Sequence, residues 1–176
     1  MALDPGVHLG YALLGREFAL GTLVLSRDYR DAVEEAVEKL RPLLLKADRV
    51  YVEEWGYQGR RLGKEQMVPL ALTGAFLALG AVPVDPLWKR KMTDGLVVGG
   101  PGQDLYLRRL GVRFPSGLDR KDRALWLRLH LEGYDPVLRY VRELPKKLRP
   151  HALDALALAV YARSVEAYLE REVVHG

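Results

Sequence analysis

The order of the predicted elements constrains the fold of this chain more than any other feature. Apolar segments typical of short strands lie at residues 2–3, 10–14, 18–26, 48–54 and 81–84. The first three follow one another directly, and Gly15-Arg16-Glu17 suits a hairpin turn between the second and the third. Apolar residues recur at helical spacing over residues 31–46 and 63–79, which lie between the later strands. Hairpins followed by helical crossovers predict an α/β fold with a mixed five-stranded sheet flanked by helices.

The second half of the chain is predicted to be mostly helical. Helical patterns cover residues 118–131 and 150–172, and Pro150 stands near the first turn of the latter, where proline is tolerated. In the first half, Pro42 should end or kink its helix, and Gly80 closes the next one. Residues 93–120 are less regular and leave two alternatives open, a mobile loop or an inserted helix.

Length and composition predict a single domain over residues 1–176, long enough for a good core. The absence of cysteine excludes disulfides and thiolate–zinc chemistry. No run of about 18 or more apolar residues is present, so no membrane span is expected. No secretory signal is recognised either, and the chain is expected to work in the cytoplasm of a bacterium or as a phage-encoded protein. The lack of Asn and Cys is a tendency of thermophile proteins, so a thermophilic source is expected.

The charge distribution suits a polyanionic partner. The net charge is +4 and the pI is about 9.3. Basic residues gather in residues 86–128, whereas residues 28–54 are rich in acids. A basic middle beside an acidic centre fits phosphate binding next to metal ligands.

Three acidic residues stand in apolar surroundings. Asp4 ends the first strand and begins an Asp-Pro-Gly turn, Glu53 ends an apolar strand, and Asp154 lies within the apolar final helix. Carboxylates in such places are costly unless a cation meets them, and three together repel unless a metal ion holds them. A site for a hard cation is therefore the first hypothesis.

The predicted topology brings two of these acids together. The crossover makes the strands of Asp4 and Glu53 parallel, and adjacent strands lie about 4.8 Å apart, so both carboxylates reach the same edge of the sheet. Glu54 has the opposite side-chain direction, and the apolar pattern does not settle which of Glu53 and Glu54 faces Asp4. His151 and Asp154, three residues apart, share one face near the start of the final helix.

Each of these residues also has a purely structural interpretation. Asp-Pro-Gly at Asp4 is a common turn signal, and Glu53 fits the solvated end of a strand. Asp154 suits the positive end of a helix dipole, and a lone His151 is more often a satisfied or exposed histidine than a ligand. Their combination favours the metal-site hypothesis.

In order and spacing these pieces resemble the RuvC-type Holliday junction resolvases. The segment from Leu3 to Ala12 is similar to the opening of that family, with Leu9 in place of the usual Thr. Val50-Tyr51-Val52-Glu53 is similar to its strand ending in the second catalytic acid. The segment His151–Ala157 resembles the closing Asp-Ala-Ala-Asp-Ala-Leu-Ala signature, with His151 at the first Asp, as in some members. The resemblance covers most of the chain, is weakest over residues 92–118, and implies a ribonuclease-H-like fold.

The resemblance implies a specific site and chemistry. Its catalytic and metal-binding residues are Asp4, Glu53, His151 and Asp154, which hold two Mg²⁺ ions. Two ions about 3.5–4 Å apart stabilise the attacking water and the leaving oxygen in phosphodiester cleavage. His151 is either a ligand or a proton carrier. Because imidazole carries less charge than the usual Asp, Mn²⁺ is expected to substitute for Mg²⁺.

The resemblance also implies residues that contact DNA. An aromatic residue that engages junction bases maps to Gly56, so its flanking residues Trp55 and Tyr57 are the candidates, since stacking needs only an exposed ring. A core or rim position is the alternative for each. Backbone contacts map to Lys89 and less closely to Lys121. Arg90, Lys91, Arg120 and Arg123 are expected to share that task.

The leading prediction is an endodeoxyribonuclease that resolves four-way DNA junctions by paired symmetric nicks, acting as a homodimer, since the junction has two equivalent strands to cut. Three alternatives remain open. The first is a ribonuclease-H-like nuclease on flaps, RNA–DNA hybrids or other branched DNA. The second is a non-catalytic nucleic-acid-binding module. The third, an actin-like nucleotide-binding domain, is disfavoured because such proteins need two domains of this kind.

Overall fold

The computed structural model describes residues 1–54, 63–96, 98–99 and 101–175. Its central element is a five-stranded sheet with the strand order β3-β2-β1-β4-β5. The strands are β1 (Ala2–Asp4), β2 (His8–Leu13), β3 (Ala19–Val24), β4 (Tyr51–Glu53) and β5 (Val82–Val84). β1, β2 and β3 form antiparallel pairs, whereas β4 is parallel to both β1 and β5. The predicted α/β fold, with a mixed five-stranded sheet flanked by helices, is confirmed.

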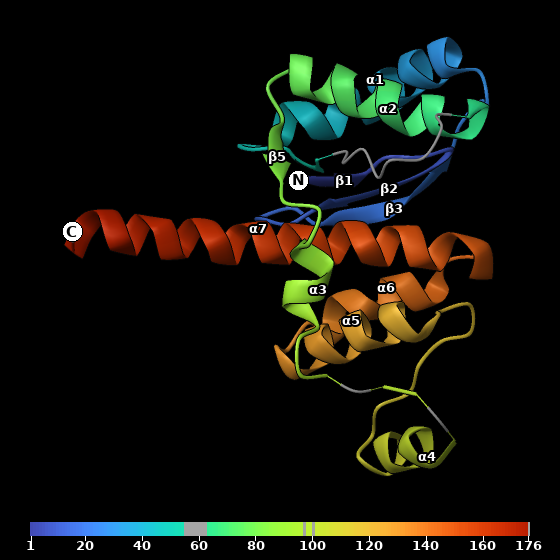
Figure 1. Cartoon of the computed structure of the whole chain (residues 1–176), viewed down its shortest axis with the longest axis vertical. Coiled ribbons are helices and arrows are strands. Elements are labelled where there is room, and N and C mark those ends of the chain that lie inside the picture. The colour runs from blue at the N-terminus through green and yellow to red at the C-terminus, as the bar shows by residue number, and fades with distance from the viewer. Residues whose placement is uncertain (55–62, 97, 100, 176) are drawn as a thin grey trace.

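Helices cover both faces of this sheet (Figure 1). α1 (Tyr29–Lys46) and α2 (Lys64–Ala78) lie on one face, and α7 (Arg149–His175) crosses the other. α3 (Trp88–Met92), α5 (Arg120–Leu131) and α6 (Asp135–Glu143) form a further layer beyond α7. α4 (Pro101–Arg109) lies farther out, and a single 3₁₀ turn, Lys146–Leu148, leads into α7.

The alternation of side chains along β1 divides the core between the two faces of the sheet. Leu3 packs with Leu9, Leu40 and Phe76 on the side of α1 and α2. Ala2 packs on the other side, with the buried apolar residues of α7 from Leu153 to Ala162 and the helices beyond it. Successive residues of a strand point to opposite faces, so the residue after Leu3 returns to the α7 side.

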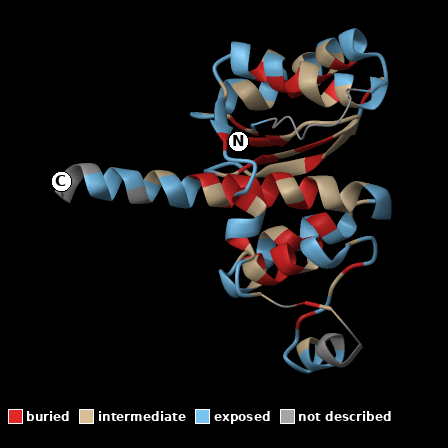
Figure 2. Cartoon of the chain, viewed as in Figure 1, coloured by how far each residue is buried: buried red, intermediate tan, exposed pale blue. Residues whose placement is uncertain are grey.

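α7 is the most deeply enclosed helix of the described chain. Between Ala152 and Ala162 nearly every residue is buried, because the sheet lies against one side of α7 and α3, α5 and α6 lie against the other. Figure 2 shows this buried stretch, and the exposed remainder of α7 projecting beyond the body. The apolar sequence around Asp154 therefore reflects burial on all sides.

Of the two outcomes predicted for Pro42, an end or a kink, the helix end does not occur. α1 continues through this proline to Lys46 and ends at Ala47, whose N–H donates to Leu43 and Leu44. Buried Ala32, Ala36 and Leu40 pack the helix into the core beside α2, and this packing outweighs the lost hydrogen bond. Of the two alternatives for residues 93–120, the inserted helix is present, as α4. Within the described part of the chain, none of the helices has the length and apolar character needed to cross a membrane.

Candidate active site at the carboxyl edge of the sheet

Asp4 and Glu53 end two neighbouring parallel strands. In the register of β1 and β4, Ala2 lies opposite Tyr51 and Leu3 opposite Val52, so the next position on each strand is a carboxylate. Ala2 and Tyr51 both belong to the core on the α7 side. By the alternation of strand side chains, Asp4 and Glu53 project toward α7 as well.

Glu53, not Glu54, is the acid turned toward this side. Glu53 is half-buried, and its carboxylate accepts a hydrogen bond from the Trp88 indole at 3.0 Å. Burial raises the pKa of Glu53; the Trp88 hydrogen bond opposes the rise, and the negative charge of Asp4 adds to it. Glu54 is exposed, and its backbone N–H donates to Val84.

His151 reaches Asp4 from the first turn of α7. Its Nδ1 lies 3.6 Å from an Asp4 carboxylate oxygen, and its ring stacks on that of His8 with the centroids 5.2 Å apart. Burial lowers the pKa of His8, and neighbouring His151 lowers it further. His8 begins β2, so β1, β2 and α7 meet at this point.

The close contact of α7 with β1 and β2 depends on Gly10. Gly10 pairs with Asp4 across β1 and β2, and a Cβ atom on Gly10 would lie 1.9 Å from the His151 carbonyl oxygen. Only a residue without a side chain allows the backbone of α7 to lie so close to the sheet. Thr22 of β3 adds a second link by donating to the Leu148 carbonyl at 2.8 Å, just before α7.

Asp154 is held by a lysine. The Lys89 ammonium donates to Asp154 at 2.9 Å and to Asp122 at 2.8 Å, and so connects α3 to both α7 and α5. Burial raises the pKa of Asp154 well above its usual range, the Lys89 charge opposes this rise, and Asp4 and Asp122 add to it. Burial lowers the pKa of Lys89, but the two carboxylates raise it more, so the lysine stays charged.

The four predicted catalytic residues thus gather around one edge, with Asp4 at the centre. Asp4 lies beside His151, and its charge acts on both Glu53 and Asp154. Even so, no three His, Asp or Glu side chains within residues 1–54, 63–96, 98–99 and 101–175 form a group that could hold a metal ion. Lys89 supplies the positive charge at Asp154 in this structure.

The donor set itself suits a hard cation. Carboxylate oxygens are the preferred ligands of Mg²⁺, and imidazole accommodates Mn²⁺ and other transition ions. Burial raises the pKa of both Glu53 and Asp154, and the charge of Asp4 adds to each rise, so a bound cation would favour the ionised form of both carboxylates. The types of donor present therefore suit a divalent metal ion, although the described residues do not group them around a common point in this structure.

The predicted DNA-contacting residues are distributed unevenly. Trp55 and Tyr57 lie outside the described residues. Lys89 is largely buried, since 26% of its side chain is exposed, and it donates to two carboxylates. Arg90 and Lys91 are exposed on α3, where Lys91 pairs with Asp85 at 2.6 Å; on α5, Lys121 is exposed and Arg123 is half-buried. The roles of all of them toward DNA stay predictions.

Three residues of the site were not anticipated from the sequence. His8, Trp88 and Asp122 contact His151, Glu53 and Lys89 respectively. Asp122 lies in the first turn of α5, where its N–H donates to the capping Asp119. An acidic residue is common at this place in a helix, so the position of Asp122 alone gave no reason to assign it to a site. Its one distinguishing signal is that a charged residue stands at a buried position of an amphipathic helix.

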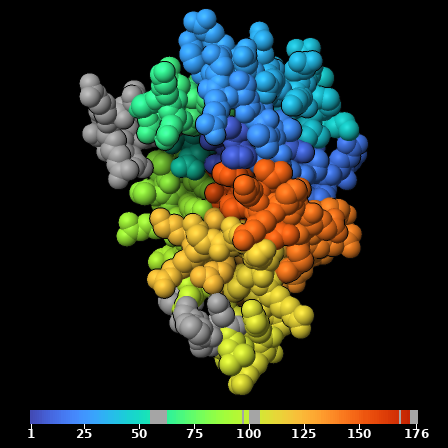
Figure 3. All heavy atoms as spheres, turned by 90° about the vertical axis from the view of Figure 1, so that its right-hand side faces the viewer, coloured from blue at the N-terminus to red at the C-terminus, as the bar shows by residue number. Residues whose placement is uncertain are grey.

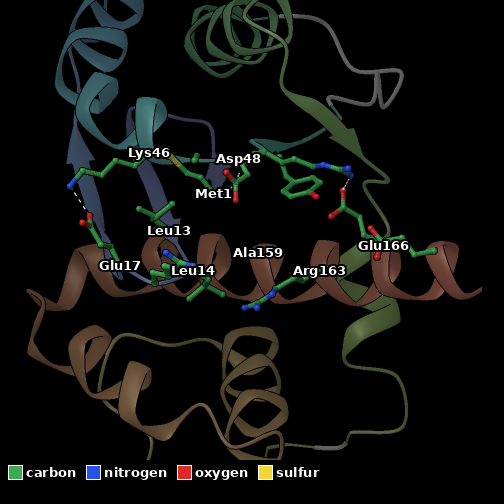
Figure 4. A pocket seen from close by; sticks show the side chains of 15 residues that line it. Met1, Leu13, Leu14, Glu17, Lys46, Asp48, Ala159, Arg163 and Glu166 are labelled. Carbon is green, nitrogen blue, oxygen red and sulfur yellow. Dashed lines mark hydrogen bonds and ion pairs between the residues drawn. The ribbon is translucent and has the colours of Figure 1, made fainter.

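The face of the molecule at which α7 begins is shown in Figure 3. The orange start of α7 lies between the blue layer of the N-terminal strands and α1 on one side and the yellow and orange helices on the other. A pocket of about 780 Å³ lies instead at the amino ends of β1 and β4 (Figure 4). It is lined by Met1, Lys46, Tyr51 and Glu166, among others, and contains none of the predicted catalytic residues.

No family model matches this sequence, and no curated protein matches it. Two solved structures are similar in fold. One is a T. thermophilus RuvC in complex with a Holliday junction substrate, at 18% identity and a TM-score of 0.43, over 90% of this chain and 88% of that one. The other is a Thermus thermophilus RuvC structure, at 17% identity and a TM-score of 0.38, over 92% of this chain and 93% of that one.

Proposed function

We propose that this chain is a metal-dependent endodeoxyribonuclease that cuts four-way DNA junctions. The observation that carries the proposal is the convergence of Asp4 and Glu53, from adjacent parallel strands, with His151 and Asp154, from the start of α7. Carboxylates at one sheet edge, with a histidine among them, are the donors that metal-assisted phosphodiester hydrolysis requires.

Asp4, Glu53, Asp154 and His151 would hold the ions, which we propose to be two Mg²⁺, with Mn²⁺ able to substitute. When bound, such ions polarise the phosphoryl oxygen and neutralise the charge that develops as the ester bond breaks. The chain itself positions the donors. Trp88 fixes one oxygen of Glu53, the stacking on His8 orients the His151 ring, and the imidazole is placed beside Asp4 either to bind metal or to carry a proton.

Exposed basic residues are placed to bind the DNA backbone. Arg90 on α3 and Lys121 on α5 belong to the helices that supply Lys89 and Asp122 to the site. Lys and Arg contacts to phosphate give affinity without sequence preference and orient the duplex. We propose a homodimer, because a two-fold axis would match the two equivalent strands of a junction.

The test is cleavage of a synthetic four-way junction with Mg²⁺ or Mn²⁺, with product ends mapped on both strands. Asp4→Asn, Glu53→Gln and Asp154→Asn should each lower the cutting rate by about a hundredfold or more while junction binding survives, because each removes charge stabilisation of several kcal/mol. Glu54→Gln is the matched control, since Glu54 is the exposed neighbour of Glu53, and it should cut like the unchanged protein.

Parallel assays on a flap and an RNA–DNA hybrid separate the junction from the other ribonuclease-H-like substrates. Preferential, symmetric nicking of the junction supports the proposal. Equal or faster cutting of the hybrid would assign the site to another nucleic acid, and full activity in all three single variants would rule out the assigned site.

A further inference from the structure

Lys89 contacts a carboxylate that the proposed metal site would use. Its ammonium lies 2.9 Å from Asp154, a carboxylate that the proposed function gives to the metal, and 2.8 Å from Asp122. A fixed positive charge on this oxygen repels a divalent cation that approaches the same carboxylate. Glu53, by contrast, accepts its hydrogen bond from the neutral indole of Trp88.

The carboxylates of Asp4 and Glu53 therefore differ from that of Asp154 in how easily they bind a metal ion. An ion at Asp4 and Glu53 meets two carboxylates at the ends of adjacent strands, whereas an ion at Asp154 has to displace the Lys89 ammonium. Asp122 makes that displacement feasible. It is buried and anchored by its own N–H to Asp119, so Lys89 retains one carboxylate partner when it leaves Asp154. The exchange leaves no buried charge unpaired.

We propose that Lys89 is a resident cation of this site, which neutralises Asp154 in the metal-free protein and competes with the second divalent ion for it. Asp122 is the alternative partner that receives the lysine. The two ions then bind in order, the first tightly at Asp4 and Glu53 and the second weakly at Asp154. This inference rests on the metal-binding part of the proposed function and requires no DNA.

Binding of Mn²⁺, followed by the loss of the electron paramagnetic resonance signal of the free ion, tests the competition without any measurement of cleavage. The informative variant is Lys89→Met combined with Asp122→Asn, which removes the cation and its anchor together, so that no ammonium competes for Asp154. The matched control is Lys91→Met combined with Asp85→Asn, which removes an exposed pair beside the same helix with the same change in charge.

In the unchanged protein and the control, the second Mn²⁺ should bind at least about tenfold more weakly than the first. In the Lys89 and Asp122 double variant, the second site should tighten by about tenfold, the scale of effects seen when groups around metal ligands are altered. Equal affinities in the double variant and the control, or the absence of any bound Mn²⁺, would overturn the proposal.

A second measurement does not depend on the folding of a variant. In the unchanged protein, the ammonium nitrogen of Lys89, assigned by its loss in Lys89→Arg, should change its nuclear magnetic resonance shift as Mg²⁺ saturates the weaker site. A shift that stays constant to saturation contradicts the competition. If the metal measurements agree with the proposal but no junction is cut, the nuclease function fails and the inference stands. If the junction is cut normally but Mn²⁺ binding is unaltered in the double variant, the inference fails and the nuclease function stands.

Discussion

Each carboxylate of the candidate site is stabilised by a different kind of neighbour. Glu53 accepts from an indole, Asp4 lies beside an imidazole, and Asp154 accepts from an ammonium. A buried carboxylate without such a partner is strongly destabilising, so these neighbours matter to folding as well as to chemistry. They also fix where each oxygen stands before any ion arrives.

The Trp88 indole is expected to matter for ion binding. Trp88→Phe keeps a buried aromatic ring but removes the N–H that orients Glu53, so the affinity for Mg²⁺ and the cleavage rate should each fall about tenfold. Trp126→Phe is the control, because Trp126 is equally buried but its ring lies under the Arg142 guanidinium. Calorimetric Mg²⁺ titration of both variants measures the difference, and similar affinities in the two would contradict a positioning role for Trp88.

Tyr51 gives a prediction for alkaline pH. Burial, with the nearby Glu166, raises the pKa of this phenol from 10.0 to about 12. Because the neutral phenol is favoured by folding, its contribution to the free energy of unfolding is full below pH 10.0 and is lost as the pH rises through about 12. Urea denaturation across this range should show a steeper loss of stability in the unchanged protein than in Tyr51→Phe. Parallel curves would contradict the shift.

At the scale of elements, the close contact of β2 with α7 is the most demanding junction of the fold. Gly10→Ala should lower the free energy of unfolding by about 1–3 kcal/mol or more, because its Cβ meets the His151 carbonyl of α7. Gly74→Ala, in the interior of α2 with no atom within 4 Å of the added Cβ, should instead raise it by about 0.5–1 kcal/mol. Chemical denaturation of both variants tests the contrast, and equal effects would show that α7 does not press on Gly10.

The same elements show what the sequence could and could not predict. The hairpins and crossovers could be predicted because the spacing of apolar residues and the turn residues are local features of the sequence. The direction of Glu53 was not, since Tyr51 and Val52 are both buried in a sheet covered on its two faces, and no alternation remains to be read. The Lys89 network was also hidden, because it joins α3, α5 and α7, whose contacts arise only from long-range packing.

At the scale of the whole molecule, the exposed cations should govern affinity for DNA. Arg90→Ala and Lys121→Ala are each expected to weaken junction binding and to lower the slope of log affinity against log salt by about 0.9 for each lost phosphate contact. Lys39→Ala is the control, since Lys39 is exposed on α1, across the sheet from the site. Junction binding measured over a range of salt concentrations tests this prediction. An equal change of slope in Lys39→Ala would show that Arg90 and Lys121 have no special role in DNA binding.

The late position of α7 in the sequence has a consequence for synthesis of the protein. Asp4 and Glu53 lie in β1 and β4, whereas His151 and Asp154 lie in α7, so a ribosome makes the second pair of donors well after the first pair. A partly synthesised chain holds Asp4 and Glu53 without Asp154, and such a chain cannot assemble the proposed site. A copy that lacks α7 is therefore expected to show none of the proposed cleavage activity.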